Sequence, residues 1–243
     1  MPGLCSVALG LLLWQALVQT GAVTPDILPA PWAVVQEWRG LAASGVLWRH
    51  VSVTLTEGLL GFALAFVVGV VLGYPLARSR VFASALTPYI TTAQAMPIIA
   101  LAPLIVMWFG LGLFPKVLIC ALIVFFPILI NTAVGLRSIE REMIEAAQNM
   151  GANAWQILRH VEIPLALRPL LGGVKVGVTL AMTGAIVGEF VASDAGLGYL
   201  MNLGRSDYDS AMVLAAALTI VGVALLGYLV VGLLEYVLIS WDR

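Results

Sequence analysis

The stretch Glu145–Pro164, EAAQNMGANAWQILRHVEIP, is the one long polar interruption in a chain that is otherwise apolar. It predicts a polar helix, a turn at Gly151 where glycine lets the backbone reverse, and a second short helix over residues 154–160. Pro164 fits the first turn of the helix that follows. A helix–turn–helix between two apolar segments indicates a docking element for a soluble partner. The alternative is an amphipathic hairpin that lies on the membrane surface and only connects two spans.

The composition of the chain places it in a membrane. Its 243 residues are 61% hydrophobic and 10% charged, with a mean hydropathy of +1.03. A soluble domain is about 45–50% apolar and about 25% charged, so this excess of apolar side chains does not fit inside a water-soluble core. The formal net charge of -1, together with the lack of any basic block, gives no indication of a nucleic-acid partner.

A membrane helix needs roughly 20 predominantly apolar residues, and the chain offers six such segments. They lie at about 4–20, 54–76, 85–108, 116–136, 170–192 and 212–238. We therefore predict an all-α, polytopic protein with about six transmembrane helices. The whole chain, 1–243, forms a single domain with a polar loop at about 137–169. The third segment carries Pro88, Pro97 and Pro103, which are expected to break it.

The first segment has an alternative reading as a cleaved signal peptide. Its leading residues, Met1-Pro2-Gly3, lack the basic side chains that precede a signal core, and no clean Ala-x-Ala cleavage site follows. These two features favour a retained span.

Basic residues in short loops predict the orientation, because they are enriched on the cytoplasmic side. The richer side holds Arg78, Arg80, Arg137, Arg141, Arg159, Arg168 and Arg243. The other side holds Arg39, Arg49, Lys116 and Arg205. Both termini are therefore expected in the cytoplasm. Amphipathic indoles prefer the interface, which places Trp32, Trp38, Trp48 and Trp108 near the outer surface and Trp241 near the inner one.

Pairs of glycines four residues apart occur in two segments and indicate close helix–helix contact. Gly69 and Gly73 form one pair in the second segment. The fifth segment carries two pairs, Gly173 with Gly177 and Gly184 with Gly188, and is expected to make a helix–helix contact that could include the seam of a dimer. The alternative is that glycine is simply common in membrane helices.

Polar residues within apolar segments are costly in lipid and are therefore candidates for contact with a transported solute. The polar candidates are Gln94, Asn131 and Glu189, and Met96 and Pro97 are added because they form the break beside Gln94. Glu189 lines the path, senses a docked partner, or is an interfacial carboxylate bonded to nearby backbone or Ser193. The alternative for Gln94 and Asn131 is that their side chains form hydrogen bonds between helices rather than contact a solute.

We expect the other ionisable residues to have local structural roles. Lys175 is expected to pair locally or to extend to the inner surface. Glu57 is expected either to pack against neighbours or to be exposed at the interface. The single histidines His50 and His160 are expected at interfaces. The sequence contains no arrangement that resembles a nucleophile–base pair or a metal site, so we expect neither catalysis nor a bound metal or cofactor.

The polar loop also has a specific spacing: Glu145-Ala146-Ala147, three residues, Gly151, nine residues, then Val161-x-Ile163-Pro164. This spacing resembles the signature of the permease subunits of ATP-binding-cassette (ABC) importers, with Val and Ile in place of the usual Ile and Leu. The resemblance implies a type I importer permease fold whose loop forms coupling helices in a cleft of the ATPase. It assigns the coupling contact to Glu145, Ala146, Ala147, Gly151, Ala154, Trp155 and Pro164.

Further motifs extend the resemblance over nearly the whole chain. Those similar to the nitrate, sulfonate and taurine branch are Leu28-Pro29-Ala30-Pro31, Met96–Leu104, Trp108-Phe109-Gly110, Phe125-Phe126-Pro127 and Gly196-Leu197-Gly198-Tyr199. Within that branch, Gly112–Val117 and Gly188-Glu189-Phe190 are more similar to permeases for thiamine-pyrimidine precursors or riboflavin.

The resemblance also implies a division of labour in the cell membrane. Two permease copies form the path, two separate ATPase subunits hydrolyse ATP, and an extracytoplasmic binding protein delivers the solute. The chain lacks the G-x-x-x-x-G-K-[ST] phosphate-binding motif, in keeping with a non-catalytic subunit. The alternative function is an ion-coupled carrier or channel. Such carriers usually show inverted repeats and several charges at mid-membrane, and the sequence displays neither.

Overall fold

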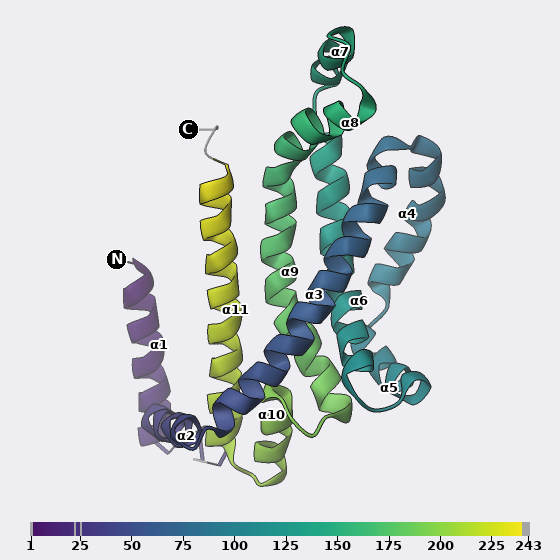
Figure 1. Ribbon diagram of the computed structural model, residues 1–243. Helices are drawn as coiled ribbons and strands as arrows, with labels where there is room; N and C mark the ends of the chain where they lie inside the picture. The colour runs from purple at the N-terminus through teal and green to yellow at the C-terminus, as the bar shows by residue number, and fades with distance from the viewer. Residues whose placement is uncertain (1, 22, 25, 240–243) are drawn as a thin grey trace.

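A computed structural model describes residues 2–21, 23–24 and 26–239, and the secondary structure of these residues is helical, without strands. Four helices are long and apolar enough to cross a membrane: α3 (Val46–Arg78), α6 (Leu113–Arg137), α9 (Ile163–Ala192) and α11 (Ser210–Leu238). Figure 1 shows that they run between two ends of the molecule, one with α7 and α8 and the other with α2 and α10. We call these the α7–α8 end and the α10 end.

Shorter helices complete the described chain. They are α1 (Pro2–Gln19), α2 (Pro31–Ala43), α4 (Arg80–Ala95), α5 (Ile98–Phe109), α7 (Arg141–Asn149), α8 (Ala154–Ile157) and α10 (Leu197–Ser206). The apolar part of α1 that is described, Ala8–Gln19, is too short to count as a span. The described residues therefore contain four spans, or up to five if α4 and α5 form one, and six is not reached.

The third predicted span breaks sharply, as expected, but at one of its three prolines. The helices α4 and α5 meet at an angle of 93° across Met96 and Pro97. Pro97 precedes α5 as its N-cap, where its missing N–H costs nothing. Pro88 and Pro103 instead lie inside α4 and α5. The prediction that these two prolines also break the segment is wrong.

The fifth predicted span starts earlier than expected. Helix α9 begins at Ile163 rather than near Leu170, and it continues from α8 through a π-helical turn, η1 (Leu158–Glu162). Pro164 lies in the first turn of α9, where its fixed φ fits. It does not interrupt the helix, so the second helix of the polar loop and the membrane span form one rod.

Glycines bring α3, α6 and α9 into close contact. A Cβ on Gly69 or Gly73 of α3 would meet Ile128 or Thr132 of α6 at 2.8 or 2.7 Å. The four paired glycines of α9 also face neighbours within the chain: Gly173 meets Asn131, Gly177 meets Phe62, Gly184 meets Cys120, and Gly188 meets Lys116. The predicted helix–helix contact is confirmed. These glycines pack against neighbours inside one chain, and the suggestion that the contact includes a dimer seam stays a prediction.

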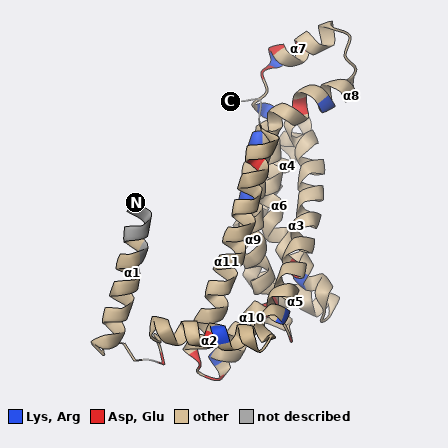
Figure 2. Ribbon diagram, turned by 60° about the vertical axis from the view of Figure 1, so that its left-hand side comes forward, with Lys and Arg blue, Asp and Glu red and all other residues tan. Residues whose placement is uncertain are grey.

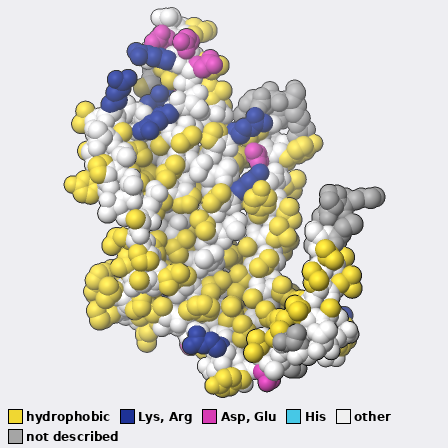
Figure 3. All heavy atoms as spheres, turned by 180° about the vertical axis from the view of Figure 1, so that it is seen from behind, with side chains coloured by type: hydrophobic (Ala, Val, Ile, Leu, Met, Phe, Trp, Pro, Cys, Tyr) yellow, Lys and Arg dark blue, Asp and Glu magenta, His cyan; other side chains and the backbone are white. Residues whose placement is uncertain are grey.

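The charged residues divide between the two ends, as Figure 2 shows. Helices α3 and α6 finish at Arg78 and Arg137, at the α7–α8 end, so the arginine-rich loops share one end. The tryptophans of α2 and α5 lie at the α10 end. Figure 3 shows apolar side chains over much of the face between the two ends. The expectations for Trp241 and Arg243 fall outside the described residues.

Candidate functional site

The turn after α7 is fixed by its own backbone. Gly151 has φ +83°, a left-handed conformation that favours glycine. Its N–H donates to the carbonyl of Gln148 at 2.9 Å, and the N–H of Ala152 donates to that of Ala147 at 3.1 Å. This pair of hydrogen bonds is the Schellman motif, which ends a helix by satisfying its last carbonyls. The predicted turn at Gly151 is confirmed.

Helix α8 begins with an equally defined cap two residues later. The side chain of Asn153 accepts from the N–H of Gln156 at 2.9 Å, and the side chain of Gln156 accepts from the N–H of Asn153 at 2.8 Å. This reciprocal capping box satisfies two N–H groups that a helix start leaves free. The stop of α7 and the start of α8 are thus both locked, and the α7–α8 segment has a definite shape.

The α7–α8 segment presents apolar side chains at its surface. Met150 is 88% exposed and Trp155 is 64% exposed. Helix α7 has no buried residue, and its Glu145 is paired with Arg141 at 2.8 Å in the open. A concavity of about 370 Å³ lies beside them, lined by Ala147, Met150, Gly151, Ala152, Gln156, Ile157, His160 and Val161. An exposed apolar surface of this kind is typical of a protein contact.

The predicted coupling residues divide into an exposed group and a supporting group. Five of them are exposed on the α7–α8 segment: Glu145, Ala146, Gly151, Ala154 and Trp155. Ala147 and Pro164 are half-buried. Ile157, expected on the same apolar side as Trp155, is buried, so only part of that side remains available to a partner.

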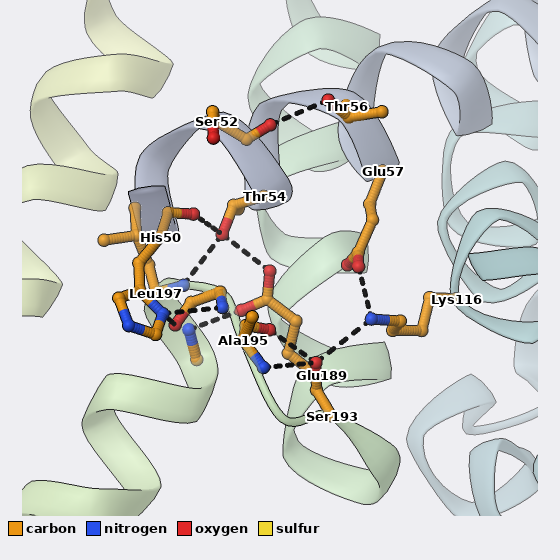
Figure 4. Close-up of polar contacts among 12 residues, drawn as sticks. His50, Ser52, Thr54, Thr56, Glu57, Lys116, Glu189, Ser193, Ala195 and Leu197 are labelled. Atoms are coloured by element: carbon orange, nitrogen blue, oxygen red, sulfur yellow. Dashed lines mark hydrogen bonds and ion pairs between the residues drawn. The ribbon is translucent and has the colours of Figure 1, made fainter. Parts of the chain in front are cut away.

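A second polar site lies at the α10 end, where three side chains hold the start of α10 (Figure 4). The N–H groups of residues 196 and 197 donate to Nδ1 of His50 and Oγ1 of Thr54, each at 2.8 Å. The N–H of residue 198 donates to Oε2 of Glu189. These are among the first N–H groups of a helix, which have no partner within it. Glu189, Thr54 and His50 therefore cap α10 from other helices.

The capping groups are deeply buried and connected. Glu189 and Thr54 are each 1% exposed, and the Thr54 hydroxyl donates to Oε1 of Glu189 at 2.6 Å. His50 is buried and its ring stacks on that of Tyr199. The expected bonding of Glu189 to nearby backbone is confirmed. The interfacial location expected for His50 stays a prediction, and its side chain is buried among helices at the α10 end.

A buried ion pair lies next to these caps. Lys116 of α6 pairs with Glu57 of α3 and also donates to Oγ of Ser193 at 3.0 Å. Glu57 is 1% exposed, so of the two roles expected for it, packing is confirmed and interfacial exposure is not. Burial of a charge requires a paired partner, and Lys116 supplies it. Lys116 and Glu189 also border a cavity of about 650 Å³ at this end, together with Tyr199 and Asn202.

Two of the other path candidates line one concavity between α4 and α6, where Gln94 is exposed and Asn131 is half-buried. The concavity has a volume of about 340 Å³ and is also lined by Ile98, Ile123, Phe126, Pro127 and Ile130. The Asn131 side chain donates to the carbonyl of Pro127 at 2.8 Å, which fixes its amide. Met96 and Pro97 form the bend between α4 and α5 and are not in this lining.

Ion pairs between helices also involve residues that the sequence did not single out. Lys175 of α9 pairs with Glu235 of α11, which confirms the local pairing expected for Lys175. Arg78 of α3 pairs with Glu162 of η1. Glu162 occupies the variable position in Val161-x-Ile163-Pro164, so the motif gave no reason to select it. The one feature of the sequence that could have pointed to Glu162 is its carboxylate between the apolar Val161 and Ile163.

The four membrane-length helices and the capped, exposed α7–α8 segment define a polytopic membrane protein with a structured, partly apolar surface at one end. Residues 65–239 match the family of binding-protein-dependent transport system inner membrane components. The chain belongs to this family and is a transmembrane permease subunit of an ABC importer. The family resemblance seen in the sequence and the predicted all-α permease fold are thereby confirmed.

Two curated relatives illustrate the range of the family. The chain is 48% identical over 232 residues to the riboflavin transport system permease protein of Chloroflexus aurantiacus, covering 96% of this chain and 87% of that protein. It is 33% identical over 219 residues to the formylaminopyrimidine transport permease protein of Halalkalibacterium halodurans, covering 90% and 87%.

Solved structures share the fold. An inward-facing form of the MetNI methionine ABC transporter matches with a TM-score of 0.64 and 22% identity, covering 86% of this chain and 98% of that one. An amino acid ABC transporter matches with a TM-score of 0.65 and 17% identity, covering 81% and 96%.

Proposed function

We propose that this permease imports riboflavin. The relative named for riboflavin is 48% identical and matches over 96% of the chain, whereas the one named for formylaminopyrimidine is 33% identical. A thiamine-pyrimidine precursor is the second candidate, and sulfonate, taurine and nitrate follow. The chain itself is non-catalytic in this proposal, and two separate ATPase subunits supply the energy.

The α7–α8 segment is the proposed contact with the ATPase. The observation that carries this assignment is the exposed Met150 and Trp155 beside a concavity at the end of two locked helices. The coupling residues are Glu145, Ala146, Ala147, Gly151, Ala154, Trp155 and Pro164. Since α8, η1 and α9 form one helical rod, a push on α8 moves the start of a membrane span. Such rigid-body motion suits alternating access.

The proposed path runs between the two ends through a pair of permease copies. Gln94 and Asn131 line one concavity between α4 and α6, and their amides suit a planar, polar solute. Met96 and Pro97 form the adjacent bend, and Glu189 borders the cavity at the α10 end. In this proposal the whole chain is one domain, the α7–α8 end and both termini are cytoplasmic, and an extracytoplasmic binding protein docks at the α10 end.

The experiment that tests this proposal is ATP hydrolysis by the reconstituted complex with its binding protein. Riboflavin, hydroxymethylpyrimidine, taurine and nitrate are added separately to the wild type and to Glu145→Lys. Glu142→Lys reverses an equivalent exposed charge on the same helix outside the motif and is the matched control. We expect stimulation by riboflavin that is lost in Glu145→Lys and kept in Glu142→Lys.

Each other result has a definite meaning. Stimulation by another solute would replace riboflavin and leave the importer intact. Equal loss in both variants would show that charge alone, rather than the motif position, governs the contact. Retention of stimulation in Glu145→Lys would remove Glu145 from the coupling contact.

A further inference from the structure

The pair formed by Arg78 and Glu162 joins the α7–α8 segment to a different membrane helix. Arg78 is the last residue of α3, and Glu162 is the last residue of η1. The two residues are 84 positions apart in the chain. Glu162 is only 5% exposed, so its side chain does not belong to the surface that a docked ATPase touches. Its contact is directed inward, to α3.

The location of Glu162 makes it sensitive to movement of α8. It lies in the π-helical turn between α8 and α9, and single π turns frequently mark functional positions in helices. Ile157 of α8 is buried one turn earlier, so α8 is anchored to the bundle on this side. Any displacement of α8 passes through η1 before it reaches α9.

The far end of α3 is equally well anchored. His50 and Thr54 of α3 hold the backbone N–H groups of residues 196 and 197 at the α10 end. Helix α3 therefore has polar contacts at both ends: one with the segment that follows α8, and one with the start of α10. A single unbroken helix of 33 residues connects them.

The chemistry of the pair favours positioning over simple stabilisation. The Arg78 side chain is 32% exposed, and a partly exposed ion pair contributes little net stability. The buried carboxylate of Glu162, however, is strongly unfavourable if it loses its partner. The second oxygen of Glu162, Oε2, is buried and has no hydrogen-bond partner among the described residues. Arg78 is the charged partner of this carboxylate, with the Tyr74 hydroxyl also beside it, and the ion pair ties the two helices together.

We propose that Arg78 and Glu162 are positioning residues that transmit the movement of α8 to α3. This inference rests on the proposed ATP-driven function of the α7–α8 segment. Without the pair, the ATPase still docks on the exposed residues of that segment and still hydrolyses ATP. The movement then fails to reach the α10 end, and hydrolysis is uncoupled from transport.

The test measures how ATP changes the accessibility of a cysteine placed at the α10 end. It therefore does not depend on which solute is carried. Leu111, which is 83% exposed between α5 and α6, is replaced by Cys in a Cys5→Ala, Cys120→Ala background. The complex with its ATPase is placed in nanodiscs, and labelling by a polar maleimide is measured with and without ATP and vanadate. The variants are Glu162→Gln, Arg78→Gln and the exchanged pair Arg78→Glu with Glu162→Arg.

A second ion pair provides the matched control. Lys175 and Glu235 link α9 to α11 with side-chain exposures of 22% and 26%, and neither belongs to η1 or α3. We expect ATP to change the labelling in the wild type and in Glu235→Gln. We expect the change to be lost in Glu162→Gln and Arg78→Gln, although ATPase co-purification and hydrolysis persist. The exchanged pair should restore most of it.

The contrary outcomes are separable. If the wild type shows no ATP-dependent change, the ATP-driven switch in the proposed function fails and this inference fails with it. If the wild type responds and both single variants respond equally, the transmission role alone is overturned. Loss of ATPase co-purification in the single variants, or failure of the exchanged pair to restore the change, would also overturn it.

Discussion

The hydroxyl of Thr54 on α3 donates a 2.6 Å hydrogen bond to Oε1 of Glu189 on α9, 135 residues later in the chain. The same hydroxyl oxygen accepts the N–H of Leu197 at the start of α10. One buried threonine thus connects three helices. A buried group of this kind is costly to remove, because each of its partners is left without a hydrogen bond.

Replacement of Thr54 by Val should loosen the start of α10. Valine matches threonine in shape but leaves both a carboxylate oxygen and an N–H group unpaired, at a cost of about 1–3 kcal/mol. We expect faster hydrogen exchange in residues 193–200 of the purified permease. Thr56→Val is the control, since the exposed Thr56 hydroxyl bonds only to the carbonyl of Ser52 in its own helix. Equal protection in both variants would contradict the capping role.

Gly196→Ala should disturb the same site more severely. The backbone there has φ +120°, and a Cβ would lie under 3.0 Å from the carboxylate of Glu189. The strained backbone alone costs about 1–3 kcal/mol. Gly110→Ala places alanine at a positive φ, +79°, with no atom within 4 Å, so it isolates the backbone strain from the overlap. We expect a lower melting temperature for Gly196→Ala than for Gly110→Ala. Similar melting temperatures would show that the overlap of the new Cβ with the Glu189 carboxylate does not destabilise the protein.

Gly184→Ala should weaken the contact between α6 and α9. Its Cβ would lie 2.7 Å from the Cα of Cys120, a backbone atom that moves only with the whole helix. Overpacking of this kind costs about 1–3 kcal/mol. Gly172→Ala, on the same helix with nothing within 4 Å, is the matched control. In detergent, Gly184→Ala should unfold at a lower temperature than Gly172→Ala. Equal melting temperatures would show that α6 and α9 move apart at little cost.

Gly151→Arg should leave membrane insertion intact and weaken ATPase association. The residue lies outside the bundle, and its φ of +83° makes any side chain costly by about 1–2 kcal/mol. Gly45→Arg is closely matched, because Gly45 has φ +79°, open space around its Cα, and a place at the other end of the molecule before α3. Co-purification of the ATPase should fall only in Gly151→Arg. Normal co-purification and uptake in that variant would refute the coupling assignment.

The sequence by itself determined the class of protein and the outline of the α7–α8 segment. Apolar runs of span length require a membrane, and the spacing from Glu145 to Pro164 is contained in one short stretch. The turn at Gly151 and the cap at Asn153 follow from contacts among neighbours in that stretch. Local chemistry of this kind can be read directly, because the interacting groups are only a few residues apart.

The tertiary structure alone decided what the buried polar residues and the glycines face. Periodicity places Gly184 or Glu189 on one side of a helix, but not the neighbour across from it. Cys120 opposite Gly184, Thr54 beside Glu189 and Arg78 beside Glu162 are brought together by packing over 60 or more residues of chain. The same packing turns the paired glycines of α9 toward α3 and α6. Such pairings depend on the relative rotation of whole helices, which is set by all their contacts together.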